Sequence, residues 1–222
     1  MDNKTLPLPD RSNYQYGYQV AYRLASEKLA AARDLEQLCR KSGSKLESTG
    51  GKSTITLRYL NKIYHVSHPE INVSLADSNE AVPIKDKVLI LHYINNAEGA
   101  PVTGNRITYK ELPEGIIYAS NFTKRTIRPL LKSFGNNPEL LLKAVAMFDY
   151  QEAGYGDLAL TINAFSHVPI TLVLWRGDDE FAPEGSIIFD STIPSYLSTE
   201  DITVLCENIV WGIVSSLKEE TG

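Results

Sequence analysis

Two stretches of alternating apolar and polar residues constrain the fold of this chain more than any other feature. The first is TITLRYL at 54–60, and the second consists of the runs at 158–164 and 170–174. Successive side chains on a strand point to opposite faces of a sheet, so a period of two indicates strands that are buried on one face. We therefore predict three or four antiparallel strands over residues 45–76 and a second strand cluster over residues 158–189.

Helical patterns, in which apolar residues recur every three or four positions, surround both strand clusters. They predict helices over 14–41, over 120–134 and from Asn137 onward. A last helix is predicted after the capping-box residues 198–201. Residues 84–95 could form a buried strand or a buried helix, because their apolar run has no clear period. The proline directly ahead of them favours the helix.

These patterns together predict an α+β fold, with a mainly antiparallel sheet in two strand clusters flanked by helices. The likeness of TITLRYL to PITLVLW at 169–175 makes an α-βββ-α pseudo-repeat a candidate arrangement. A hairpin turn is predicted at residues 61–62, between two of the strands. Residues 1–13 are polar and contain two prolines, which predicts a flexible arm and leaves 14–222 as a single α+β domain.

The composition excludes several classes of function. The formal net charge is −5 and the sequence pI is about 5.4, so the chain lacks the positive surface that general nucleic-acid binding or an anionic membrane requires. No apolar run is long enough to span a membrane and no signal-peptide pattern is present, which predicts a cytoplasmic protein. Cys39 and Cys206 have no zinc spacing, so no cysteine-bound iron–sulfur cluster is expected.

An acidic segment follows the apolar run at 170–174 and is a candidate site. Carboxylates gathered near strand ends could hold Mg²⁺ or Ca²⁺ or act as general acids and bases, and the adjacent Trp175 and Arg176 could contact a ligand. The other interpretation is a solvated hairpin loop, since the carboxylates match no known metal-ligand spacing. The candidate metal ligands are Asp178, Asp179, Glu180 and Asp190.

Four further residues are candidate ligand-binding groups. His92 lies in an apolar run, where its imidazole could be a base, an axial ligand to a metallocofactor, or a core histidine with a satisfied hydrogen bond. The glycine-containing loop 99–115 carries Arg106 and Tyr109, and Arg125 follows it; either guanidinium could bind a carboxylate or phosphate. Three tyrosines near the N-terminus could line a pocket or a dimer contact: Tyr14, Tyr16 and Tyr18.

Several of these segments together resemble one protein family. The stretches 91–115, 125–135 and 156–201, the last of which contains GDDEF, are similar to a bacterial and archaeal domain-of-unknown-function family, the one numbered three-seven-eight-six. The resemblance covers about residues 15–217 and implies an origin in anaerobic metabolism. Some members look fused to a cysteine-rich iron–sulfur segment, which this chain lacks. The resemblance implies no catalytic residues. The matching positions are Gly104, Arg106, Arg125, Gly156, Asp157, Trp175, Gly177, Asp178, Glu180, Phe181, Pro183 and Asp190.

Three functions fit these observations. The first is a cytoplasmic binding or accessory protein of anaerobic metabolism, which holds a small molecule or a flat cofactor for a partner enzyme. A tetrapyrrole, either a corrinoid such as cobalamin or a haem, is the candidate cofactor. The second is a metal-assisted enzyme that uses residues 178–180 with Asp190 and a divalent ion. The third is a homodimeric scaffold. The site is expected between loop 99–115 and the acidic segment after Trp175.

Overall fold

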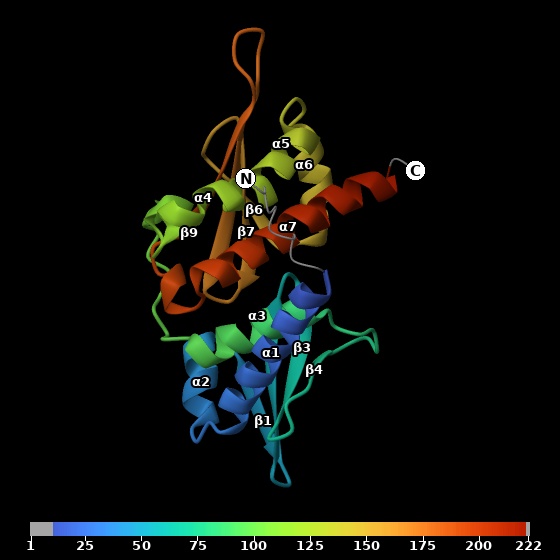
Figure 1. Ribbon diagram of the computed structural model, residues 1–222, viewed down its shortest axis with the longest axis vertical. Coiled ribbons are helices and arrows are strands. Elements are labelled where there is room, and N and C mark those ends of the chain that lie inside the picture. The colour runs from blue at the N-terminus through green and yellow to red at the C-terminus, as the bar shows by residue number, and fades with distance from the viewer. Residues whose placement is uncertain (1–10, 221–222) are drawn as a thin grey trace, which may run out of the picture.

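The chain forms two lobes that are stacked along the long axis of the molecule (Figure 1). The computed structural model describes residues 11–220. Each lobe contains one antiparallel sheet, with four strands in the lower lobe and five in the upper lobe. This architecture confirms the predicted α+β class and both strand clusters. Residues 1–10 of the predicted arm lie outside the described residues, and α1 begins at Arg11, inside that arm.

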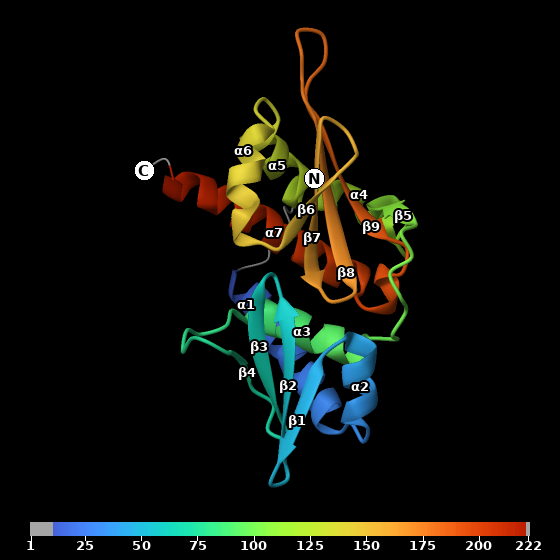
Figure 2. The ribbon, with the colours of Figure 1, turned by 180° about the vertical axis from the view of Figure 1, so that it is seen from behind.

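The lower lobe is one uninterrupted stretch of chain. Its strands lie in the order β1-β2-β3-β4, and α1 and α3 lie on one side of this sheet (Figures 1 and 2). The helix over residues 84–95 is confirmed as α3. The elements are α1 (Arg11–Ala30), α2 (Leu35–Ser42), β1 (Lys45–Thr49), β2 (Lys52–Tyr59), β3 (Lys62–His68), β4 (Val73–Leu75) and α3 (Ile84–Asn96).

The single helix predicted over residues 14–41 is wrong, because the chain breaks into α1 and α2. Asp34 caps α2 by accepting a hydrogen bond from the backbone N of Gln37 at 2.8 Å. An aspartate at this position satisfies a helix N–H that has no partner within the helix, so it favours a new start over continuation. The helix α2 ends at Gly43, whose left-handed φ of 66° is typical of a glycine that terminates a helix.

The predicted turn at residues 61–62 is displaced by one residue. Tyr59 pairs with Lys62, so the two turn residues are Leu60 and Asn61, both with positive φ. A two-residue turn of this kind matches the twist of the strands that it joins. Its conformation also points the Leu60 backbone N at the carbonyl oxygen of Ala164, 3.0 Å away in the other lobe. The turn therefore links the two sheets.

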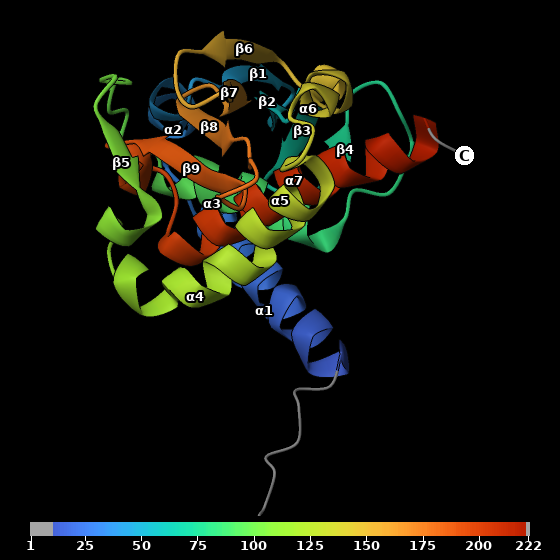
Figure 3. The same cartoon turned by 90° about the horizontal axis from the view of Figure 1, so that it is seen from above.

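The upper lobe is built on a sheet with the strand order β5-β9-β8-β7-β6. Figure 3 shows α4, α5 and α7 on one side of this sheet. The elements are β5 (Arg106–Thr108), α4 (Gly115–Arg125), α5 (Ile127–Phe134), α6 (Glu139–Ala144), β6 (Tyr150–Ala153), β7 (Leu158–Phe165), β8 (Val168–Trp175), β9 (Glu184–Asp190) and α7 (Thr199–Glu220), with 3₁₀ turns η1 (Tyr109–Glu111), η2 (Val145–Met147) and η3 (Ile193–Ser195).

Two predictions for the upper lobe need correction. The single helix over 120–134 is two helices, α4 and α5, which meet at Thr126. The hydroxyl of Thr126 donates to the carbonyl of Phe122 at 2.7 Å, and such bonds to the preceding turn bend or end helices. The loop 99–115 is also not wholly irregular, because Arg106–Thr108 forms the edge strand β5 beside β9.

The candidate pseudo-repeat is not confirmed. Both lobes contain a meander of four consecutive antiparallel strands, β1–β4 below and β6–β9 above. The two similar heptapeptides occupy different places in these meanders, however. TITLRYL lies mainly in β2, the second strand of the lower meander, whereas PITLVLW lies in β8, the third strand of the upper one. The strands also differ in burial, because the central residues of β8 are buried on both faces of the sheet. The likeness therefore does not mark equivalent strands.

The hydrophobic core is continuous between the lobes. At the boundary the Phe165 ring stacks on Tyr93 at a centroid distance of 4.1 Å and on Tyr59 at 4.8 Å. All three side chains are buried. Aromatic stacks of this kind contribute packing energy beyond that of buried area. A core shared by both lobes is compatible with a single domain over 14–222. That domain assignment stays a prediction.

Candidate functional site

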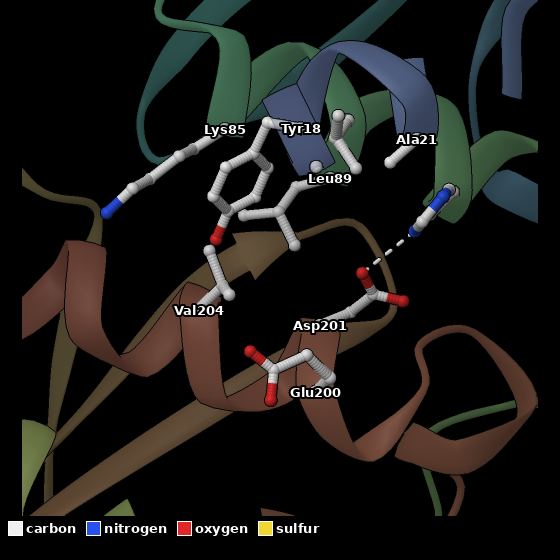
Figure 4. Close-up of a pocket in the computed structure, with 10 residues that line it drawn as sticks. Tyr18, Ala21, Lys85, Leu89, Glu200, Asp201 and Val204 are labelled. Carbon is white, nitrogen blue, oxygen red and sulfur yellow. Dashed lines mark hydrogen bonds and ion pairs between the residues drawn. The ribbon is translucent and has the colours of Figure 1, made fainter. Parts of the chain in front are cut away.

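The candidate site is a cavity between the lobes, which we call the inter-lobe cleft. It has a volume of about 300 Å³ and lies between α1, α3 and the first turns of α7. Figure 4 shows α1 and α3 on one side and α7 on the other. Boundaries between lobes are frequent places for ligand sites. The side chains that matter most in its wall are Tyr18, Lys85, Val88, Leu89, His92, Asp201 and Val204.

Helical periodicity brings these residues together. On α3, residues 85, 88, 89 and 92 follow steps of three and four, so they lie on one face of the helix. On α7, Asp201 and Val204 lie on one face for the same reason. The start of α7 is fixed by a capping box, in which Ser198 Oγ accepts from the backbone N of Asp201 at 3.2 Å. The cap thereby sets the position of the Asp201 carboxylate.

A histidine–aspartate pair spans the cleft. Nδ1 of His92 lies 2.8 Å from Oδ1 of Asp201, while Oδ2 of Asp201 accepts from the Ser198 hydroxyl at 2.6 Å. An ionised carboxylate can only accept, so the proton of a neutral His92 sits on Nδ1 and Nε2 carries the lone pair. Among the side chains that the structure describes, none bonds to Nε2 of His92. Asp201 thus orients the imidazole through Nδ1. The His92 side chain is 30% exposed, which leaves Nε2 available to a ligand.

The other polar groups form a chain of ion pairs along the rim. Lys85 lies 3.9 Å from Glu207, and Arg125 bridges Glu207 at 2.8 Å and Glu200 at 3.2 Å. Burial opposes the charge on Arg125, but its hydrogen bonds to the two glutamates outweigh burial and raise its pKa. These ion pairs therefore hold positively and negatively charged side chains beside the cleft. Two of these side chains, Lys85 and Glu200, also line the cleft.

The floor of the cleft is apolar. In Figure 4 the side chains of Tyr18, Leu89 and Val204 lie between the ribbons of the two lobes. Val88, Leu89 and Val204 are all nearly buried. A cavity that combines apolar walls with a few oriented polar groups is the usual form of a small-molecule site, because burial supplies affinity and the polar groups supply orientation.

The predicted ligand-binding residues do not share one site. His92 lines the cleft. Arg125 reaches its rim through Glu200. The Tyr109 hydroxyl is buried at 2.8 Å from Thr203 Oγ1 of α7, and burial raises its pKa.

The remaining three lie elsewhere in the upper lobe. Arg106 is on the edge strand β5, and Trp175 ends β8. Arg176 pairs with Glu139 of α6, and its backbone N donates to Asp157 at 2.7 Å. The site expected between loop 99–115 and the acidic segment is therefore not the cavity in which His92 lies.

The predicted metal ligands are also not brought together. Asp178 sits in the loop before β9, where its carboxylate accepts from the backbone N of Glu180 and Phe181 and its pKa is lowered by these bonds. Asp190 ends β9, at the opposite end of that strand. Within residues 11–220, no group of three or more histidine, cysteine, aspartate or glutamate side chains could hold a metal ion.

Asp190 has a structural position that the sequence did not indicate. It is 1% exposed and accepts five hydrogen bonds, from the backbone N and hydroxyl of Thr103, the backbone N of Gly104, and the backbone N and hydroxyl of Thr192. Burial acts to raise its pKa, but these bonds outweigh burial and lower it. Its carboxylate thus fixes loop 99–105 to the end of the sheet.

Sequence reasoning missed Asp201, Lys85 and Val204. Asp201 was recognised only as a cap residue, although one carboxylate oxygen remains for a partner outside the helix. The signal that could have found it is a second stripe on α7, which runs from Asp201 through Val204 and Asn208 to Trp211. Of the three N-terminal tyrosines, for which the sequence leaves a pocket and a dimer contact open, Tyr18 lines the cleft.

The fold and the cleft define a two-lobed α+β protein with a ligand-sized cavity at the lobe boundary. The family described as a domain of unknown function (DUF3786) matches residues 34–211, so the chain belongs to that family. No curated protein and no solved structure matches the chain. Over residues 11–220, no helix has the length and apolar character needed to cross a membrane.

Proposed function

We propose that the inter-lobe cleft binds a small organic molecule through Nε2 of His92. The observation that carries this proposal is the His92–Asp201 pair, because it orients an imidazole lone pair into a cavity without using it. The ligand would donate a hydroxyl or N–H hydrogen to Nε2 and place its apolar part against Leu89 and Val204. A volume of about 300 Å³ is at the low end for ligand sites, which favours a compact ligand.

The wider role that we propose is that of a cytoplasmic accessory protein of anaerobic metabolism, which holds its ligand for a partner enzyme. One feature is compatible with a reducing compartment. Cys39 and Cys206 are free and buried, and burial raises the pKa of the Cys39 thiol to about 11. Buried free thiols are compatible with the cytoplasm, and a high pKa makes them unreactive.

A tetrapyrrole is the more specific form of this proposal. His92 would hold the metal ion of a corrinoid or haem, and Asp201 would keep the imidazole in place, as carboxylates commonly do behind metal-ligating histidines. The test is absorbance spectroscopy of anaerobically purified protein and of protein mixed with haem or cobalamin. A spectrum without a histidine-ligated chromophore in both cases would remove this form.

A second candidate is proton-transfer catalysis in the same cleft. A carboxylate that orients Nδ1 of a histidine leaves Nε2 as a general base. The residues that line the cleft include no serine, threonine or cysteine, so the lining offers the imidazole no aliphatic hydroxyl or thiol to activate, and the chemistry that we propose is the movement of a proton on the ligand. The metal-assisted enzyme gains no comparable support, since Asp190 is apart from residues 178–180.

The experiment that tests ligand binding uses the histidine rings as reporters. The chain has four histidines, so two-dimensional NMR of the ¹⁵N-labelled imidazoles gives few signals, and the His92→Gln variant assigns the signal of His92. We expect small hydroxylated and amino-substituted aromatic fragments to shift the His92 signal selectively. Saturation-transfer binding should be lost in His92→Gln.

The matched control is His65→Gln. His65 lies on β3 in the lower sheet and is not in the wall of the cleft, so fragment binding should persist in this variant. Binding that is equal in both variants would contradict the proposal.

A further inference from the structure

A second cavity lies at the other end of the α3–α7 contact, and we call it the Trp211 pocket. Its volume is about 450 Å³, and it lies between the β2–β3 turn, the start of α3, the η2 turn and the middle of α7. Figures 1 and 2 both show the β2–β3 turn next to the lower end of α6. The residues in its wall that the argument uses are Tyr59, Lys62, Asp86, Met147, Asn208 and Trp211.

The floor of the Trp211 pocket is a hydrogen-bonded triad. Oδ1 of Asp86 accepts from the Tyr59 hydroxyl at 3.0 Å and from Nδ2 of Asn208 at 2.8 Å. The Tyr59 side chain is buried, so the triad is held rigidly. Among the described side chains, none donates to Oδ2 of Asp86 or to Oδ1 of Asn208. Asp86 and Asn208 both line the pocket, so these two oxygens can accept hydrogen bonds from a ligand there.

The wall above the triad is apolar and exposed. Trp211 is 46% exposed and Met147 is 47% exposed, and both line the pocket. Large apolar side chains that stay exposed beside a cavity are typical of ligand surfaces. An indole offers a flat face for stacking, and a methionine adapts its shape to a neighbouring ring. This wall fits the face of an aromatic ring.

A cation completes the pocket. Lys62, the first residue of β3, lines it. Burial raises the pKa of Asp86, and attraction to Lys62 and Lys85 opposes that rise, so the ammonium groups act on the same carboxylate. A lysine at the rim provides a point charge for an anionic group on a ligand.

We propose that the Trp211 pocket binds an aromatic amino acid or a closely similar aromatic zwitterion. The ring lies against Trp211 and Met147, the ammonium group donates to Asp86 and Asn208, and the carboxylate pairs with Lys62. The three kinds of group in the wall match the three parts of this ligand. The proposal does not depend on the function proposed for the inter-lobe cleft, because His92 and Asp201 take no part in it.

The chain provides its own reporter for this site. It has two tryptophans, and Trp175 lies at the end of β8, away from the pocket. In the Trp175→Phe variant, all tryptophan emission comes from Trp211. Three probes are titrated into this variant: L-phenylalanine, 2-phenylethylamine without the carboxylate, and 3-phenylpropionate without the ammonium group. Their own emission does not overlap that of tryptophan.

We expect L-phenylalanine to change the Trp211 emission saturably and to bind roughly tenfold more tightly than 3-phenylpropionate, because a charged hydrogen bond contributes about that much. Its advantage over 2-phenylethylamine should be about threefold, because the carboxylate pairs with an exposed lysine. In Trp175→Phe with Asp86→Asn, the advantage of L-phenylalanine over 3-phenylpropionate should fall to about twofold. In Trp175→Phe with Lys62→Met, the advantage over 2-phenylethylamine should fall instead. Because Lys62 is exposed, this second loss should be the smaller one.

The outcomes separate this proposal from the previous one. Adding His92→Gln to Trp175→Phe should leave the affinity for L-phenylalanine within about twofold, whereas the same substitution should abolish the binding proposed for the inter-lobe cleft. No saturable change of Trp211 emission with any probe would overturn the proposal. Equal binding of L-phenylalanine and 2-phenylethylamine would overturn the assignment of Lys62. Should Asp86→Asn fail to fold, the three probes and Lys62→Met still decide the question.

Discussion

The two sides of α7 hold their neighbours by different means. One side carries an apolar stripe of four side chains that are fully buried in the core of the upper lobe, namely Ile202, Leu205, Ile209 and Ile213. The other side meets α3 through pairs of polar residues, namely Asp201 with His92, Glu207 with Lys85, and Asn208 with Asp86. Apolar burial is strong and insensitive to direction, whereas polar pairs are weaker and fix a register. Both cavities lie on the polar side, where packing is incomplete.

The largest effect is expected on the apolar side. Ile209→Ala removes a fully buried side chain from the middle of the stripe, and such truncations cost about 3 kcal/mol because a cavity remains. The measurement is urea unfolding followed by circular dichroism. Fragment binding at His92 should survive in the folded fraction. A cost below about 1 kcal/mol would mean that this side of α7 does not carry the stability of the upper lobe.

A smaller effect is expected from the polar side. Asp201→Ala leaves the donors of Ser198 and His92 without an acceptor, which costs about 2 kcal/mol when the site is mostly buried. The same unfolding assay measures it. Asp201→Asn is the matched control, because its amide oxygen still accepts one of these bonds and should recover part of the stability. If Asp201→Ala lowered the free energy of unfolding as much as Ile209→Ala does, the polar and apolar sides of α7 would not differ in their contribution to stability.

The interaction energy between His92 and Asp201, which join the two lobes, should be measurable separately from the other contributions of these residues. A double-mutant cycle with His92→Ala and Asp201→Ala isolates the coupling between the two side chains from the loss of the helix cap. We expect a coupling of about 1 kcal/mol for a hydrogen bond in a partly exposed position. Additive effects would show that Asp201 acts only as a cap, and that nothing holds the imidazole in place.

The smallest effect is a dependence on pH that only the polar side should show. Burial raises the pKa of Asp86 above its ordinary 3.8, so protonation is easier in the folded than in the unfolded chain. The stability that Asp86 contributes is therefore complete below its unfolded pKa and lost as the pH rises through its folded pKa. Asp86→Asn keeps an acceptor for Tyr59 and Asn208 but has no carboxyl group to titrate. Its free energy of unfolding should therefore rise relative to that of the unmodified protein as the pH increases through the folded pKa of Asp86.

The measurement is urea unfolding of both proteins at several values of pH from about 3 to about 7. The cost of Ile209→Ala should stay constant over the same range, since no titrating group is removed. If the difference between Asp86→Asn and the unmodified protein did not change with pH, the carboxylate would be as well solvated in the folded chain as in the unfolded one.

Periodicity accounts for most of what could be predicted. The stripe on α7 and the strands of both sheets follow from patterns that involve only neighbouring residues. The break at Thr126 and the start of α2 at Asp34 depend on single hydrogen bonds, which a pattern of apolar residues does not register. The three-residue strand β5 exists only because β9 lies beside it, and that pairing joins residues far apart in the chain.

The candidate site was predictable only in part, for the same reason. His92 could be singled out because a histidine in an apolar run is unusual, but its partner Asp201 lies 109 residues away. The acidic residues after β8 were prominent in the sequence because three carboxylates follow one another at 178–180. Their carboxylates are occupied by local backbone groups, as at Asp178, or by a distant loop, as at Asp190. Residue type alone does not distinguish an occupied carboxylate from an available one.

The lower lobe is one uninterrupted stretch of chain, and this has a consequence for the order of events during synthesis. Its four strands and three helices leave the ribosome before any strand of the upper sheet exists. Domains generally begin to fold as they emerge, so Tyr59 and Tyr93 must wait for Phe165 with their ring faces uncovered. The surface on which the two lobes meet is therefore completed only when β7 arrives.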